Sequence, residues 1–434
     1  MFKLNLMGTW GLQVVKMSWG TATVIIPHVF EKIFGFLRKP EDRVAAASTC
    51  RQWEAVIFDS CHLSADIALS VIYERDDGCQ RNVKPREIER SKRRYRNVIV
   101  APTACYDGRE SHVNWDEAKE VVGLLDRRGP IEWAMIDGRF DEQIIATHAL
   151  MGFGRVLCHL VELEVKLTLA SYWDPHWEKT FQSLTGLRSV KITGGHGRVL
   201  SSVQKHCRGL ERLVLKRFAL TKPFEKLFDF PELKELVIDE LDVSSTNLEI
   251  HYGVSEVTFP KLEHLTFLIN VKASFHHLNL VPVRFVTPAL QSARVSDLLH
   301  SFVRIEAGPQ LHHLTLNMAA FAPINYVRPS LFPNDLTSVS TITIEAEHLA
   351  PFVGMALVWT QRFCPNVTHL ILDQKLDPLI LDQITEYVST ELPKIRKVTN
   401  NSNKFRPRRF SLKFKVNNAL EDDQILTPDH LLYY

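Results

Sequence analysis

Few residues of this chain have the types and spacing that covalent or metal chemistry needs. The adjacent histidines at 276–277 and 312–313 are expected in strands. Neighbouring strand residues face opposite sides of a sheet, so neither pair makes a metal chelate alone. The chain contains no Gly-x-x-x-x-Gly-Lys-Ser/Thr, Gly-x-Ser-x-Gly or His-Glu-x-x-His sequence. Cys50 lies in an apolar helical pattern, which favours a small core residue over a nucleophile. We therefore expect no catalytic group, no metal and no cofactor.

The polar residues that do recur at a fixed spacing alternate with leucines along the body of the chain. Alternation in a strand places them on one face of a sheet and the leucines on the other. A face of mixed charge can select a protein segment by complementarity, although an ordinary solvated face has the same composition. Our candidate contacts for such a protein segment are Arg212, Lys216, Glu235, Asp239, His264, Arg294, His313, His369 and Asp373. The same face is expected to include Trp133, Met135, Glu162, Glu164, Lys191 and Asn317.

A repeat of the form Leu-x-x-Leu-x-Leu must position these residues. Its units begin at Leu160, Leu187, Leu210, Leu233, Leu262, Leu290, Leu311, Val339 and Val367, with weaker units at Ile131 and Ile395. Successive units begin 21 to 29 residues apart, a period typical of leucine-rich repeats. We therefore predict an α/β leucine-rich-repeat solenoid with parallel strands on its concave face and mixed helical and looped returns. An ordinary α/β domain is the alternative.

Residues around the repeat support its boundaries. Proline can stop a return segment and favour an extended chain after it. It stands two residues before the first apolar residue of six units, at Pro231, Pro260, Pro288, Pro309, Pro365 and Pro393. Residues 97–100 are expected to form an N-terminal capping strand. Residues 409–416 alternate apolar and polar side chains, and we expect a closing edge strand protected by lysines.

A different pattern occupies residues 25–57. Pro27 suits the first position of a helix. Apolar residues then follow at helical spacing, namely Val29, Phe30, Ile33, Phe34 and Leu37. Pro40 with Glu41 and Asp42 marks a second helix start, and a third short apolar face contains Trp53, Val56 and Ile57.

A module of roughly 40 residues is near the lower limit for an independent hydrophobic core. We therefore expect this module to leave an apolar patch uncovered, and its large candidate residues are Phe30, Phe34, Phe36 and Trp53. Burial of such a patch against a partner protein would be favourable. A helical cap that packs on the following domain is the alternative.

The order Pro27, Val29-Phe30, Ile33-Phe34, Leu37, Asp42, Cys50-Arg51, Trp53 resembles an F-box. The eight-residue step from Asp42 to Cys50 and the Cys-Arg-x-Trp ending are its most specific parts. The chain departs from the family pattern at His28, Phe30, Arg43 and Thr49, and the step from Leu37 to Asp42 is one residue longer than usual.

The resemblance implies a non-enzymatic substrate receptor. An F-box docks on the S-phase kinase-associated adaptor of a cullin–RING (SCF-type) ubiquitin ligase, and the rest of the chain selects a protein substrate. The adaptor-binding residues that it implies are Pro27, Val29, Phe30, Ile33, Phe34, Leu37, Cys50 and Trp53. A non-degradative interaction scaffold and a small-molecule-responsive receptor are the alternatives.

Composition excludes other classes of function. The 52 basic and 50 acidic residues give no global attraction to nucleic acid or an anionic membrane. Seven scattered cysteines without a Cys-x-x-Cys indicate a reducing compartment and argue against disulfides and zinc. No apolar run approaches the ~20 residues of a membrane span, and Lys16 and Gly20 interrupt the N-terminal apolar patches. We expect a cytoplasmic or nuclear protein.

The expected order of domains is an extension (1–21), an F-box (22–62), a basic linker with helical character (63–94), the repeats (95–416) and a tail (417–434). Met17 is an alternative start of the chain. The basic run at 81–96 is expected to be a solvated linker or helix face. If it binds anything, the lack of interleaved aromatic residues favours nuclear import over nucleic-acid binding.

Overall fold

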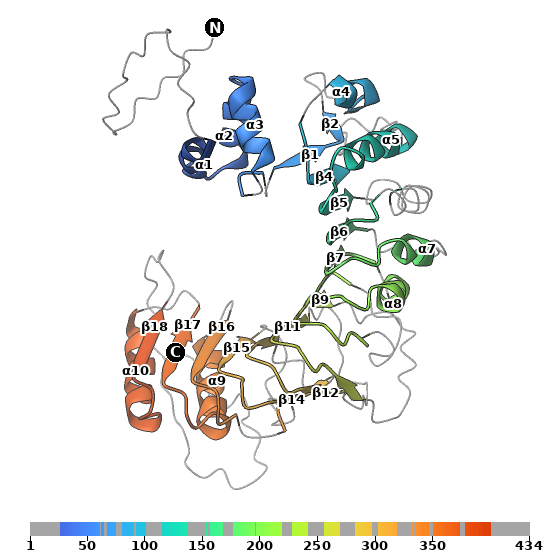
Figure 1. Ribbon diagram of the computed structural model, residues 1–434. Coiled ribbons are helices and arrows are strands. Elements are labelled where there is room, and N and C mark those ends of the chain that lie inside the picture. The colour runs from blue at the N-terminus through green and yellow to red at the C-terminus, as the bar shows by residue number, and fades with distance from the viewer. Residues whose placement is uncertain are drawn as a thin grey trace, which may run out of the picture. The chain divides into compact units, whose positions relative to one another are not determined.

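The described residues form two compact units that divide between Ile67 and Ala68. The structure is a computed structural model (Figure 1). It describes residues 27–60, 62–64, 67–74, 80–90, 93–100, 115–137, 153, 157–167, 177–195, 197–218, 228–241, 256–269, 283–296, 303–318, 331–333, 336–346, 350–373 and 378–400. The expected extension, closing strand and tail, and the histidines at 276–277, lie outside these residues.

The first unit contains three helices, as the apolar spacing predicts: α1 (Pro27–Gly35), α2 (Pro40–Ala47) and α3 (Arg51–Asp59). Proline begins α1 and α2, where its missing N–H removes no helical hydrogen bond. Lys39 and Cys50 precede α2 and α3 in extended conformation. The Ser60 hydroxyl, just after α3, donates to the Glu31 carboxylate and so joins the end of α3 to α1.

The second unit is built on a sheet of 13 strands in chain order, and every neighbouring pair in it is parallel. The strands are β1 (Ala68–Ser70), β4 (Asn97–Val100), β5 (Trp133–Asp137), β6 (Glu162–Lys166), β7 (Ser189–Thr193), β8 (Arg212–Lys216), β9 (Glu235–Leu241), β11 (His264–Ile269), β13 (Ser292–Ser296), β15 (His313–Met318), β16 (Thr341–Ala346), β17 (His369–Leu372) and β18 (Lys397–Asn400). All eleven repeat strands and the strand at 97–100 are confirmed. The leucine-rich-repeat solenoid itself stays a prediction.

The segment expected as a linker, 63–94, differs from that expectation. It contains β1, the antiparallel pair β2 (Ile72–Glu74) and β3 (Gln80–Asn82), and α4 (Pro85–Arg90). Strand β1 pairs with β4 and begins the large sheet. Its three residues, Ala-Leu-Ser, are too short and too weakly apolar to show a strand period.

The returns between strands are of two kinds. After β4, the described residues place helices in five of them: α5 (Trp115–Asp126), α7 (Trp177–Gln182), α8 (Gly197–His206), α9 (Ala350–Phe363) and α10 (Pro378–Glu391). Three middle returns instead contain β10 (Glu256–Thr258), β12 (Val283–Thr287) and β14 (Val303–Ala307), which pair as a second parallel sheet. Our expectation of helices and loops alone is therefore wrong here. Branched and aromatic side chains alternate in β12, which favours a strand.

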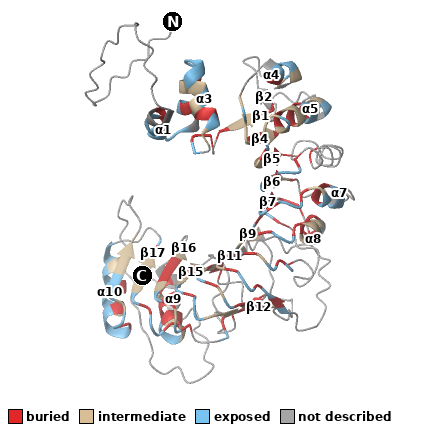
Figure 2. Ribbon diagram, in the orientation of Figure 1, coloured by how far each residue is buried: buried red, intermediate tan, exposed pale blue. Residues whose placement is uncertain are grey.

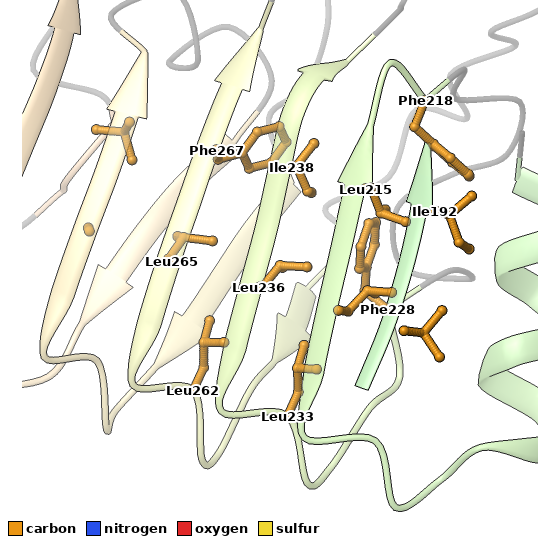
Figure 3. Packing of buried hydrophobic residues seen from close by; sticks show 14 of the residues in the cluster. Ile192, Leu215, Phe218, Phe228, Leu233, Leu236, Ile238, Leu262, Leu265 and Phe267 are labelled. Carbon is orange, nitrogen blue, oxygen red and sulfur yellow. The ribbon is translucent and has the colours of Figure 1, made fainter. Parts of the chain in front are cut away.

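One hydrophobic cluster fills the space between the strands and their returns. The register aligns Leu236 with Leu265 and Ile238 with Phe267, so apolar side chains stack from strand to strand (Figure 3). Phe259, which directly follows β10, and Phe285 of β12 lie edge to face, with their ring centroids 5.2 Å apart. The apolar residues of all five return helices belong to the same cluster, so these helices cover one face of the sheet. Along β6 and β7, buried residues alternate with intermediate or exposed ones, which therefore lie on the opposite face. Figure 2 colours the residues by burial. Within the described ranges no helix has the length and apolarity to cross a bilayer.

Candidate partner-binding sites

Three aromatic rings pack against one another in the three-helix unit. Phe30 and Phe34 of α1 are 8% and 3% exposed. Their ring centroids lie 5.9 Å apart, and Phe34 meets Trp53 of α3 edge to face at 5.2 Å. Edge-to-face and stacked aromatic pairs contribute beyond their buried area. Phe30 and Phe34, which we expected to contact a partner, therefore hold the unit together.

A second group of apolar side chains on this unit is exposed to solvent. Ile33 is 51% exposed and Phe36 is 85% exposed. The Phe36 amide donates to the Ile33 carbonyl at 3.2 Å, which places the two residues on the last turn of α1. We call Ile33 and Phe36 the apolar patch. Leu37 beside it is half-buried, and the side chains of Pro27 and Val29 lie outside the described atoms. The spacing of apolar residues did not show which of them face solvent.

Arg43 takes an unexpected place in the unit. It stands where the F-box pattern has an apolar residue, and it is only 6% exposed. Its Nη1 donates to the carbonyl oxygen of Leu37 at 2.6 Å and lies 3.5 Å from that of Arg38. These carbonyls belong to the turn that follows α1, beyond its helical hydrogen bonds. The hydrogen bonds of Arg43 therefore stabilise the turn between α1 and α2.

We expect Arg43→Ala to lower the free energy of unfolding of the first unit by about 2 kcal/mol. A hydrogen bond to a charged group contributes about 1.5–3 kcal/mol, and the substitution removes the one that the Leu37 carbonyl accepts from Arg43. Amide hydrogen exchange followed by mass spectrometry on residues 27–60 measures this directly. Exposed Arg51→Ala is the matched control and should leave exchange unchanged. Equal exchange in the two variants would contradict the role given to Arg43.

The interpretation of Cys50 as a core residue is wrong. Its side chain is exposed, because the residue is the extended N-cap of α3 and lies outside the helical period. Among the other described cysteines, Cys158 is exposed, and Cys207 and Cys364 are buried. Burial raises the pKa of the Cys207 thiol to about 12, so this thiol is protonated and unreactive at neutral pH.

The large sheet brings the candidate substrate contacts together on the face opposite the core, which we call the open face. Strand register aligns one row from Trp133 through Arg212, Glu235 and His264 to His369. A second row contains Glu164, Lys191 and Arg294. Further along the strands, Lys216 lies beside Asp239, and Asn317 lies beside Glu345. Asp373 directly follows β17 and is exposed. The predicted face is thus correct as a shared face. Contact with a substrate remains a prediction.

Ion pairs between adjacent strands occupy the open face from β6 to β9. Glu164 pairs with Lys191 at 2.8 Å and Arg212 with Glu235 at 2.8 Å. Lys216 pairs with Asp239 at 3.2 Å. Exposed pairs of this kind contribute only about 0.2–1 kcal/mol each, but they leave little charge available to a partner.

The open face from β11 to β18 has a different character. Nε and Nη2 of Arg294 donate to the Glu345 carboxylate at 2.8–3.0 Å. The Asn317 side-chain amide donates to the same carboxylate at 3.0 Å. Three histidines each contact a hydroxyl on the adjacent strand of the large sheet. His264 Nδ1 lies 2.8 Å from Ser292 Oγ, His313 Nε2 lies 3.0 Å from Thr343 Oγ1, and His369 Nε2 lies 2.9 Å from Thr399 Oγ1.

Burial sets the charge of two of these histidines. It lowers the pKa of His313 below its ordinary value. It also lowers the pKa of His369, with smaller contributions from Lys397 and His313. Burial penalises the charged imidazolium, so both rings are neutral at neutral pH.

The basic run at 81–96 is partly paired with acids of the second unit. Lys84 Nζ lies 2.8 Å from Glu117, and Arg96 lies 3.2 Å from Glu132. These pairs fit the expectation of a solvated surface. In the part of the chain that the structure describes, no group of three or more histidine, cysteine or acidic residues is placed to hold a metal ion.

Comparison with protein families matches residues 27–70 to the F-box-like family. The match covers the three helices and the buried and exposed aromatic residues described above. It supports an F-box protein and, with it, a role in binding the SCF adaptor. Comparison with curated proteins found no significant match.

Proposed function

We propose that this chain is a substrate-recognition subunit of an SCF-type ubiquitin ligase. The three-helix unit binds the S-phase kinase-associated adaptor and, through it, a cullin. The open face of the second unit holds the protein to be ubiquitinated. The observation that carries the proposal is an F-box-like match over a unit that exposes Ile33 and Phe36 to solvent, because exposed apolar side chains on so small a unit favour a covering partner.

The second unit supports substrate binding by its construction. Eleven strands at a period of 21 to 29 residues resemble leucine-rich repeats. Their return segments bury one face of the sheet, so the other presents a long row of polar side chains for protein recognition.

In this proposal the chain supplies no chemical group to the reaction. It holds substrate lysines near a charged ubiquitin-conjugating enzyme and so raises their effective concentration. The chain is therefore a receptor rather than an enzyme.

Co-purification tests the adaptor half of the proposal. The tagged full-length chain should recover the adaptor and the cullin from a cell extract. An established F-box protein, prepared in parallel, shows that the extract and conditions are competent. Absence of the adaptor from our chain, while the parallel protein recovers it, would refute the proposal.

A further inference from the structure

The two halves of the open face differ in how much hydrogen-bonding capacity they leave to a partner. From β6 to β9 the charged groups largely satisfy one another across the strands. From β11 to β18, His264, His313 and His369 each use one ring nitrogen on a hydroxyl. Within the described residues, nothing engages the second nitrogen of these rings. A partner can therefore bind the second half without breaking existing contacts.

The three histidines are evenly placed. Each begins its strand, and strand register puts Ser292 between the first two and Thr341 between the last two. Adjacent strands lie about 4.8 Å apart, so successive imidazoles are about 9.6 Å apart across the sheet. A polyproline II segment has three residues per turn and advances about 9.3 Å in that turn, so every third side chain lies on the same face. A polyproline II segment that crosses the strands therefore meets one imidazole at every third residue.

The free groups on this half are mainly donors. Arg294 commits Nε and Nη2 to Glu345, and Nη1 has no partner among the described residues. The exposed Lys397 stands next to His369 in register. The Glu345 carboxylate is already held by Arg294 and Asn317. Asp373 is the exposed acid of this half. A surplus of donors suits a partner rich in acceptors.

We propose that His264, His313 and His369 form a recognition row for an extended acidic segment of the substrate, with carboxylates at every third residue. This inference rests on the proposed function, because it names the class of substrate segment that the open face takes. Glutamate or aspartate side chains would reach the free nitrogen of each ring. Nη1 of Arg294 and the ammonium of Lys397 would supply further hydrogen-bond donors beside the row.

Protonation of His313 and His369 couples this binding to pH. The charged groups that face it are Glu235 on β9, Arg294 on β13, Glu345 on β16, Asp373 beside β17 and Lys397 on β18. Glu235 is neutralised by Arg212, and the two remaining acids balance Arg294 and Lys397. A bound carboxylate favours the imidazolium and raises the histidine pKa in the complex. Affinity should therefore rise as pH falls from 8.0 to 5.5, where glutamate side chains are still mostly ionised.

Fluorescence anisotropy with the full-length chain tests the inference. The probe is a labelled peptide of five Glu-Pro-Ala repeats. We expect binding about tenfold tighter at pH 5.5 than at pH 8.0, the effect of charge contacts at the partly buried His313 and His369. A peptide of the same composition with its glutamates consecutive should bind more weakly. The triple variant His264→Gln, His313→Gln, His369→Gln should bind the spaced peptide equally weakly at both pH values.

His312→Gln is the matched control, because His312 precedes β15 and lies outside the row. It should keep the full pH dependence. No binding of the spaced peptide at pH 5.5, or an unchanged pH dependence in the triple variant, would overturn the inference. Adaptor recovery is scored separately on the same preparations. If the adaptor is recovered and the peptide is not bound, only the histidine row fails. If the peptide binds and the adaptor is not recovered, the ligase assignment fails.

Discussion

Replacing Ile33 and Phe36 together with alanine is expected to weaken binding of the SCF adaptor by about 100-fold or more, with both units still folded. The two side chains are 51% and 85% exposed in the free chain. Full burial of a large apolar side chain contributes about 1.5–3 kcal/mol, and each 1.4 kcal/mol is a factor of ten in Kd. Their removal from a solvated surface costs the fold little, within about 0.5 kcal/mol. Titration of purified adaptor against the full-length variant measures the loss.

Val161→Ala provides the control for this experiment. Val161 is an exposed apolar residue of the second unit, next to β6. Its replacement removes apolar surface that lies outside the patch, so adaptor affinity should not change. Adaptor affinity that stays at the wild-type value in the Ile33→Ala, Phe36→Ala variant would show that the patch is not the docking surface.

Phe34→Ala is expected to unfold the first unit while the second unit stays folded. Phe34 is 3% exposed and packs on Phe30 and Trp53. Removal of a buried phenylalanine costs about 3–5 kcal/mol, and a core of this size rarely supplies more than that in total. Hydrogen exchange should show loss of protection over residues 27–60 and unchanged protection in β6–β9. Adaptor binding should disappear as well, through unfolding rather than through lost contact.

Phe36→Ala is the companion variant for this test. It removes the exposed ring of Phe36, whereas Phe34→Ala removes a buried ring. It should retain the protection of residues 27–60 and lose adaptor affinity. If Phe34→Ala keeps its protection, the aromatic interior described here does not stabilise the unit.

The sequence predicts the large sheet well, because two properties of each unit act together. Leucines at alternate positions specify a strand with one buried face, and the period near 28 residues leaves room for one return segment. Strand β1 has neither property, since only Leu69 is strongly apolar. The second sheet was missed for another reason. Val283-x-Phe285 shows a strand period, but no repeat reveals that three return segments pair with one another.

The site was less predictable than the fold. The apolar spacing in α1 places Phe30, Ile33 and Phe34 in one stripe, and the helix alone does not decide which residues meet Trp53. That choice depends on the packing of α3 against α1. Arg43 was equally hard to place from the sequence. A charged residue is normally predicted to be exposed, whereas Arg43 is buried and donates to the Leu37 carbonyl. Aligned polar residues such as His313 and Arg294, in contrast, follow directly from strand register.

The order of the strands in the large sheet also determines how local unfolding spreads through it. Each inner strand is hydrogen-bonded to the strand before it and the strand after it in the repeat, so cooperativity passes from one neighbour to the next rather than through distant contacts. Fraying therefore begins at the two outer strands, β1 and β18, and moves inward. The strands backed by the second sheet open last. A destabilising substitution in β18 would therefore increase local unfolding at the His369 end of the histidine row. The ion-paired strands near β6 would stay folded.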